Sequence, residues 1–256
     1  MRVDQQPCWI LHRRPWRESS LLLEVFSRDY GRLGLVARGA RGAKSSSRGL
    51  TEPFVPLRCS WSRRSELGTM TGLEASSAKL PLRGQALWCG LYVNELMLTL
   101  FGRDDPLPEL FDVYAASLPA VVDKSSQAIA LRQIEMAMLS TLGVLPDLTQ
   151  AATSGDPILV DALYHVQPES GLVEVNAPGR NVVHGRAALF LAAHCEPMVE
   201  KQSVDSQIDE QTRREARLLT RCLIDHQLGG RALKTRELFV KSNARTRARQ
   251  KNGTGK

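Results

Sequence analysis

The sequence lacks a long apolar run. None of its hydrophobic stretches reaches the roughly 18 residues that a membrane-spanning helix needs. The only early apolar run, residues 8–11, is followed by Arg13, Arg14 and Arg17, which is not the order of a secretory signal. We therefore expect a cytoplasmic protein without a membrane segment.

Cysteine is scarce, and its spacing argues against two common structural devices. The five cysteines are odd in number, scattered and never arranged as C-x-x-C, unlike a disulfide framework or a zinc ribbon. The nearest approach to a metal site combines His194, Cys195, Cys222 and His226, but each pair falls in a segment typical of an amphipathic helix. We expect neither a metal nor another cofactor.

Catalytic motifs are also missing. The segment GARGAKS at 39–45 only faintly resembles a phosphate-binding loop, because no glycine directly precedes the lysine and the following residues cannot begin a helix. The sequence contains no G-x-S-x-G nucleophile elbow, and its five histidines are dispersed. We expect no enzymatic activity and no small-molecule substrate.

Charge is unevenly distributed along the chain. The formal net charge of +7 arises from three blocks: residues 1–80 carry +7, residues 81–210 carry −10 and residues 211–256 carry +10. Such segregation favours two basic regions that bind a polyanion and an acidic middle that does not. The alternative is that the charged blocks are only solvated surface.

The first 80 residues contain short segments rich in β-branched, aromatic and leucine residues, which is typical of strands. Between them, residues 38–50 are rich in glycine and serine and predict a long flexible loop. Five strands with one long loop predict a small closed barrel of the oligonucleotide-binding type. The expected strands are 9–12, 20–26, 32–36, 55–61 and 69–74, with a turn at 29–32 in which Gly31 takes a positive φ.

After Pro81 the hydrophobic period becomes helical. The expected helices are 85–101, 106–122 (kinked or ended at Pro119), 127–142, 186–195, 210–228 and 236–240. The polar segment 146–185 predicts a small β insertion with strands at 162–166 and 172–175. The expected α+β organisation is a barrel domain at 1–80, a helical domain at 81–240 and a basic, disordered tail at 241–256.

The loop is the most informative feature for function. The loop lies within the segment between Asp29 and Glu52, and this segment contains five basic residues and no acidic one. Glycine and serine let those side chains reach successive phosphates, and the release of counterions then gives affinity without sequence preference. The predicted nucleic-acid contacts are Arg32, Arg38, Arg41, Lys44 and Arg48, with Arg13 and Arg14, which follow the first expected strand.

Aromatic residues in the same region could stack on unpaired bases, as in other barrels of this type. Trp9 and Phe26 lie within expected strands, so we interpret them as core. Trp16 and Tyr30 stand beside turn residues and are the predicted stacking positions.

Several segments together resemble the RecO family of DNA-repair proteins. In the first half these are LHRRPWRESSL at 11–21, GR at 31–32, LVARGAR at 35–41 and PF at 53–54. In the second half they are GLYVNEL at 90–96, LR at 131–132 with Glu135, and LGGRALKTRELF at 228–239. The segments occur in the right order over most of the chain, which makes the set far more specific than any one of them.

The resemblance implies a recombination mediator that binds single- and double-stranded DNA, anneals complementary strands and works with RecR. It also implies help in loading RecA recombinase onto strands coated by single-stranded DNA-binding protein, and hence a place at the nucleoid. Some members hold zinc through four cysteines in the insertion, but residues 146–185 contain no cysteine, so zinc is not carried over. Two alternatives remain: a general RNA-binding barrel, and an interaction adaptor without a nucleic-acid role.

The helix expected at 127–142 is the predicted receptor for the tail of single-stranded DNA-binding protein. Such tails are acidic and end in phenylalanine, so they need a cation beside an apolar pocket. Leu131, Ile134, Met138 and Leu142 form the stripe expected to face the core. Arg132, Met136 and Leu139 lie off that stripe and would bind the tail. The alternative is that Arg132 pairs with Glu135 or Asp123 and that Met136 is buried.

Overall fold

The computed structural model describes residues 1–42, 49–195 and 208–241. These residues form two compact units. The first contains residues 1–106 and the described residues after Gly230, and the second contains residues 107–230. The expected disordered tail, from residue 242 onward, lies outside the described residues.

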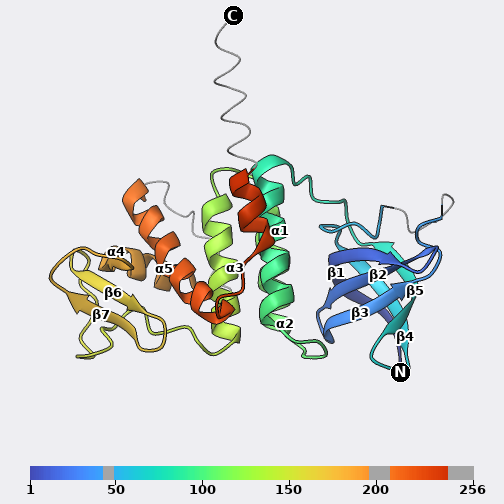
Figure 1. The fold of residues 1–256 in the computed structure, drawn as a ribbon, viewed down its shortest axis with the longest axis horizontal. Helices are drawn as coiled ribbons and strands as arrows, with labels where there is room; N and C mark the ends of the chain where they lie inside the picture. The colour runs from blue at the N-terminus through green and yellow to red at the C-terminus, as the bar shows by residue number, and fades with distance from the viewer. Residues whose placement is uncertain (43–48, 196–207, 242–256) are drawn as a thin grey trace, which may run out of the picture. The chain divides into compact units, whose positions relative to one another are not determined.

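A closed five-stranded barrel occupies the start of the first unit, as predicted. Its strands follow the order β1-β2-β3-β5-β4, and β4 returns to pair with β1 (Figure 1). The pairing of β3 with β5 is parallel, and the others are antiparallel. The strands are β1 (Arg2–Trp16), β2 (Ser20–Ser27), β3 (Gly31–Ala37), β4 (Leu57–Arg63) and β5 (Gly68–Ala75).

The first strand is much longer than the expected 9–12. It pairs with β4 through its first half and with β2 through its second half, so it must bend around the barrel. Two register shifts supply the bend, and Gln5 lies at one of them with a φ of 55°. Polar residues and Pro7 conceal this first half in the sequence, because a strand interrupted by proline does not show a clear alternation.

Helix α1 (Gly84–Leu100) packs against the barrel. The buried Asn94 donates from Nδ2 to the carbonyl oxygen of Leu11 in β1, at 2.9 Å. Gly90 permits close approach, because a Cβ there would stand 2.9 Å from the ring of Phe54. The helix therefore belongs to the same compact unit as the barrel, although it lies beyond the boundary expected near residue 80.

A helical segment at 234–241 also lies in the first unit. The Glu95 carboxylate of α1 accepts hydrogen bonds from the backbone amides of Lys234 and Thr235, at 2.8 and 2.9 Å. The Arg236 guanidinium lies over the ring of Tyr92, 5.4 Å from its centroid. These contacts tie the beginning of the segment to α1.

The second unit is mainly helical. Helix α3 packs against α2, α4 and α5, and the small sheet has the order β7-β6-β8. Strand β8 was not predicted, because three residues are too few to show a period. The elements are α2 (Pro108–Ala120), α3 (Gln127–Thr141), β6 (Leu163–Gln167), β7 (Gly171–Val175), β8 (Val182–His184), α4 (Gly185–Cys195) and α5 (Glu210–Leu228). Within the described ranges, no helix is long and apolar enough to cross a membrane.

Candidate nucleic-acid interface

Two turns of the barrel are joined by hydrogen bonds from Arg41. Its backbone amide donates to the carbonyl oxygen of Ser19, at 3.0 Å. Its Nη1 donates to the carbonyl oxygens of Arg17 and Glu18, at 3.2 and 3.1 Å. The β1–β2 turn and the turn after β3 therefore lie side by side, although about 20 residues separate them.

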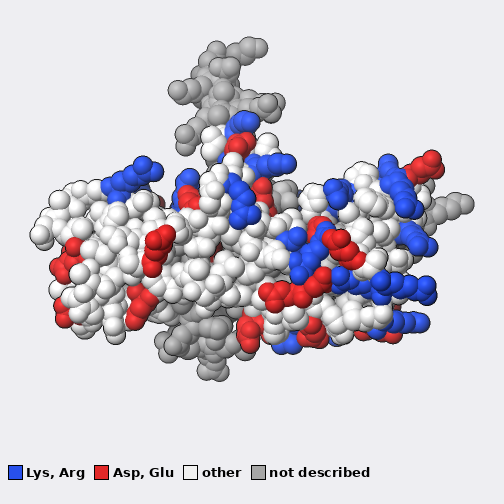
Figure 2. All heavy atoms as spheres, turned by 60° about the horizontal axis from the view of Figure 1, so that its bottom comes forward, with Lys and Arg blue, Asp and Glu red and all other residues white. Residues whose placement is uncertain are grey.

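This arrangement gathers five arginines, which we call the basic end: Arg13, Arg14, Arg17, Arg38 and Arg41. All five are exposed, and Figure 2 shows Lys and Arg side chains gathered over the barrel at the right of that view. Arg13 forms an ion pair with Glu52 at 2.5 Å. Among the described residues, Arg14, Arg17 and Arg38 have no carboxylate partner. Their charges are therefore available to a polyanion.

The sequence analysis did not include Arg17 among the contacts. Arg17 lies in the tight turn after β1, with a φ of 52°, and therefore stands beyond the ends of the strands. Its closeness in sequence to the predicted contacts Arg14 and Trp16 could have indicated the same role. Lys44 and Arg48 lie outside the described residues. Their predicted phosphate contacts therefore stay a prediction.

Arg32 is placed elsewhere, and its predicted role as a phosphate contact needs correction. Its Nη1 donates to the carbonyl oxygens of Leu98 and Phe101, at 2.7 and 2.5 Å, and its Nε lies 3.6 Å from Glu24. Only 15% of the side chain is exposed, and burial lowers its pKa while Glu24 opposes that shift. Arg32 therefore fastens the end of α1 to β3.

The two predicted stacking residues lie at opposite ends of β2. The register places Trp16 opposite Ser20, whereas Tyr30 follows the other end of the strand. At about 3.3 Å per residue, these ends are roughly 23 Å apart. Tyr30 also packs edge-on against the buried Trp61, with ring centroids 5.3 Å apart. Trp16, half-buried beside Arg14, is the aromatic residue at the basic end, while Trp9 and Phe26 are core as interpreted.

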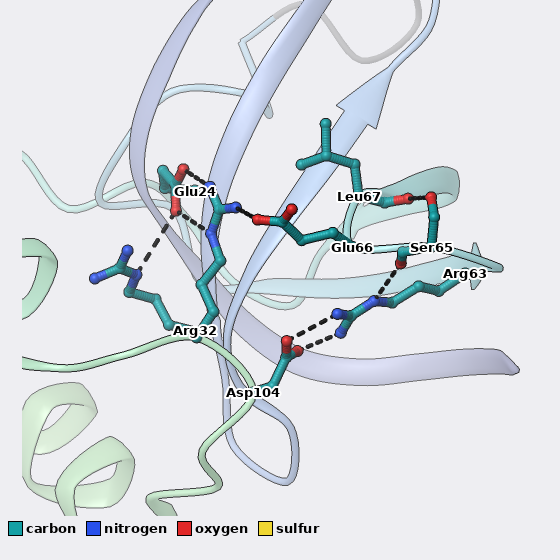
Figure 3. A network of polar contacts seen from close by, with 8 residues as sticks. Glu24, Arg32, Arg63, Ser65, Glu66, Leu67 and Asp104 are labelled. Atoms are coloured by element: carbon teal, nitrogen blue, oxygen red, sulfur yellow. Dashed lines mark hydrogen bonds and ion pairs between the residues drawn. The ribbon is translucent and has the colours of Figure 1, made fainter.

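The segment after α1 is fastened to the barrel by a network of ion pairs (Figure 3). The Arg63 guanidinium binds the Asp104 carboxylate through two nitrogens, one at 2.8 Å, and lowers the pKa of that carboxyl. Arg103 pairs with Glu24 and Glu66, and the Asp104 amide donates to the carbonyl oxygen of Arg32 at 3.0 Å. These cations are neutralised within the protein, which leaves the basic end as the main unpaired positive surface among the described residues of the barrel.

Comparison with known proteins agrees with this architecture. Family models described as recombination protein O, N-terminal and C-terminal, match residues 1–78 and 82–237. A DNA repair protein RecO from Azoarcus sp. is 41% identical over 93% of this chain and 96% of its own length. One from Neisseria meningitidis is 38% identical over 99% of this chain and 97% of its own length, and one from Methylococcus capsulatus is 39% identical over 94% and 95%.

The chain belongs to the RecO family. The names of these relatives and of both models connect the family with DNA repair and recombination. All residues of the basic end fall within the N-terminal match. Helices α1 to α5 fall within the C-terminal match.

The predicted tail receptor on α3 needs correction in part. Met136 and Leu139 have exposed fractions of 1% and 0%, so they are core residues and do not line a surface. Arg132 pairs with Glu135 through Nε and Nη2, at 2.7 and 2.8 Å, as the alternative interpretation expected. The expected core residues Ile134 and Met138 are buried as well, so α3 is buried around most of its circumference. Of the predicted triad, Arg132 alone reaches the surface, with 12% of its side chain exposed.

No metal centre forms among the described side chains, which include no group of three or more potential ligands. The side chains of His194 and Cys195 lie outside the described residues. Cys222 lies near the carbonyl oxygen of Val166, and His226 lies 3.6 Å from Glu169. Cys222 and His226 therefore contact other groups of the second unit.

Proposed function

We propose that this protein is a recombination mediator that binds single- and double-stranded DNA and anneals complementary strands. Together with RecR, it would help load RecA onto strands coated by single-stranded DNA-binding protein. It catalyses no reaction, and it acts where the DNA is, in the cytoplasm at the nucleoid. The observation that carries the proposal is the basic end, where Arg41 joins two turns and leaves Arg14, Arg17 and Arg38 exposed.

Electrostatics explains how such a surface would promote annealing. Each DNA strand carries a dense line of phosphates, so two strands repel each other until that charge is neutralised. Arginines that bind the backbone leave the bases free to pair, and Trp16 could hold an unpaired base by stacking at roughly 1–3 kcal/mol. Backbone contacts carry no sequence information, as a general repair protein requires.

The proposal predicts faster annealing of complementary strands. Labelled strands of about 60 nucleotides would be mixed with the protein, both bare and coated with single-stranded DNA-binding protein, with and without RecR. We expect acceleration on bare DNA and a dependence on RecR for loading RecA onto coated strands. Equal or better annealing of RNA would favour the RNA-binding barrel. No acceleration on any strand would overturn the proposal and favour the adaptor.

Arg132 remains the proposed contact for the tail of single-stranded DNA-binding protein. It is already oriented by Glu135, and the half-buried Ile129 lies one turn earlier on the same side of α3. A terminal carboxylate can accept two parallel hydrogen bonds from a guanidinium, and an aromatic ring can pack on the apolar neighbour.

Replacing Arg132 should therefore weaken tail binding specifically. In a fluorescence titration with a labelled tail peptide, we expect Arg132→Ala to bind about tenfold more weakly, or ~1.4 kcal/mol. Arg132→Lys serves as the matched variant, because it keeps a cation beside the buried Glu135 but loses the paired hydrogen bonds. Binding of bare single strands should stay nearly constant. Equal loss in both assays, or in neither, would contradict the assignment.

A further inference from the structure

Helix α5 carries a second group of exposed arginines, in the unit that lacks the barrel. The helix begins at the cap formed by Asp209, whose carboxylate accepts from the Thr212 amide at 2.8 Å, and ends at Gly229 in the left-handed conformation. Its buried side is apolar, and its exposed side is basic. The exposed arginines are Arg213, Arg214, Arg217 and Arg221, which we call the arginine row.

The spacing of the row suits a regular polyanion. Arg213, Arg217 and Arg221 follow one another at intervals of four residues, so each lies about 6 Å further along the helix. The three span about 12 Å in a nearly straight ridge. One strand of a DNA duplex presents a phosphate about every 3.4 Å along the axis, so the row covers about three to four phosphates.

The row is only partly neutralised within the protein. Arg214 pairs with Glu210 at 3.2 Å and Arg221 pairs with Asp225 at 3.4 Å, but these side chains are 44–76% exposed. Ion pairs so open to solvent are weak, and a phosphate can replace the carboxylate. Among the described residues, Arg213 and Arg217 have no carboxylate partner.

The composition of the row favours a nucleic-acid backbone over a protein. Protein interfaces depend on buried aromatic or aliphatic side chains at their centre. None of the large, exposed apolar side chains of the described residues lies on α5. A row of cations without an apolar anchor, and without an aromatic ring for base stacking, is suited to phosphates.

We infer that the arginine row binds the phosphate backbone of a second DNA segment, so that each unit of the chain has its own strand site. The inference rests on the proposed function and extends it. A protein with two such sites can hold both partners of an annealing reaction, which raises the concentration of one strand near the other.

The test uses the full chain with Arg213→Gln, Arg217→Gln and Arg221→Gln combined. The matched control replaces the same three residues by lysine, which keeps the charge and the helix propensity. Two short, non-complementary oligonucleotides, one with a donor dye and one with an acceptor dye, report simultaneous binding to the protein by energy transfer. Thermal unfolding confirms that each variant is folded.

We expect the glutamine variant to lose the energy-transfer signal and to anneal complementary strands about tenfold more slowly. Its affinity for a single oligonucleotide should stay within about twofold, because the basic end is intact. The lysine variant should behave like the unmodified protein. The inference would be overturned if the glutamine variant kept both the energy-transfer signal and the annealing rate of the unmodified protein. A glutamine variant that binds DNA as before but no longer binds an acidic tail peptide would also overturn the inference, and would assign the row to a protein partner.

The same experiment separates this inference from the proposed function. An unmodified protein that binds both oligonucleotides but anneals nothing would refute the proposed function alone. Loss of energy transfer in the glutamine variant would then still support a second strand site.

Discussion

Gly31→Ala should lower the thermal unfolding midpoint by on the order of 10 °C. Gly31 begins β3 with a φ of 64°, and a Cβ there would stand 1.8 Å from the carbonyl oxygen of Asp105. A side chain costs ~1–2 kcal/mol in this left-handed conformation, and overpacking adds ~1–3 kcal/mol. For a chain of this size, each kilocalorie lowers the midpoint by about 2–4 °C. Because the contacting atom of Asp105 is a backbone carbonyl oxygen, it cannot move aside as the end of a flexible side chain would.

Gly39→Ala is the matched control. Gly39 has nearly the same φ, 67°, but nothing lies within 4 Å of its virtual Cβ. The difference between the two midpoints therefore measures the close approach of segment 101–106 to the barrel. Faster tryptic cleavage after Arg103 in Gly31→Ala would show that this segment has been displaced. Equal midpoints for the two variants would contradict the packing described here.

Combined replacement of Arg41, Lys44 and Arg48 by alanine should weaken single-strand binding about 100-fold at ~0.1 M salt. Each lost phosphate contact reduces the slope of log affinity against log salt by roughly 0.7, so three contacts reduce it by about two. Both values follow from the same release of counterions and must change together. Fluorescence titrations at several salt concentrations measure them.

A charge-matched variant provides the control for that experiment. Arg2, Arg28 and Arg64 lie at the start of β1, in the β2–β3 turn and in the β4–β5 turn, away from the basic end. Their replacement by alanine removes the same net charge, and we expect a much smaller change in slope. An unchanged slope in the first variant would show that the loop does not contact phosphate. Equal losses in both variants would show that net charge alone determines binding.

Local features of the sequence were sufficient to predict most of the elements. Segments rich in β-branched, aromatic and leucine residues indicated all five barrel strands, and the helical period indicated α1 to α5. Gly31, Gly143 and Gly229 mark a turn and two helix ends, and all three have positive φ. The closed barrel is confirmed. Elements with weak patterns, such as the first half of β1 and the three residues of β8, were not predictable in this way.

The sequence could not show how similar residues would be used. Arg32 and Arg38 lie six residues apart in one basic segment, yet Arg32 binds carbonyl oxygens of Leu98 and Phe101 whereas Arg38 is exposed. Nothing local distinguishes them, because the partner carbonyls are more than 60 residues away in the sequence.

The same limit applies to helix faces. The period of α3 correctly predicted buried Ile134 and Met138, but it also predicted a second, open face where Met136 and Leu139 are buried. A helix covered on several sides shows no single apolar stripe, so its neighbours determine which face is open. The sequence by itself determined the barrel, the helices and the excess of positive charge. Tertiary structure alone decided which arginines remain exposed, because the contacts that neutralise them come from distant segments.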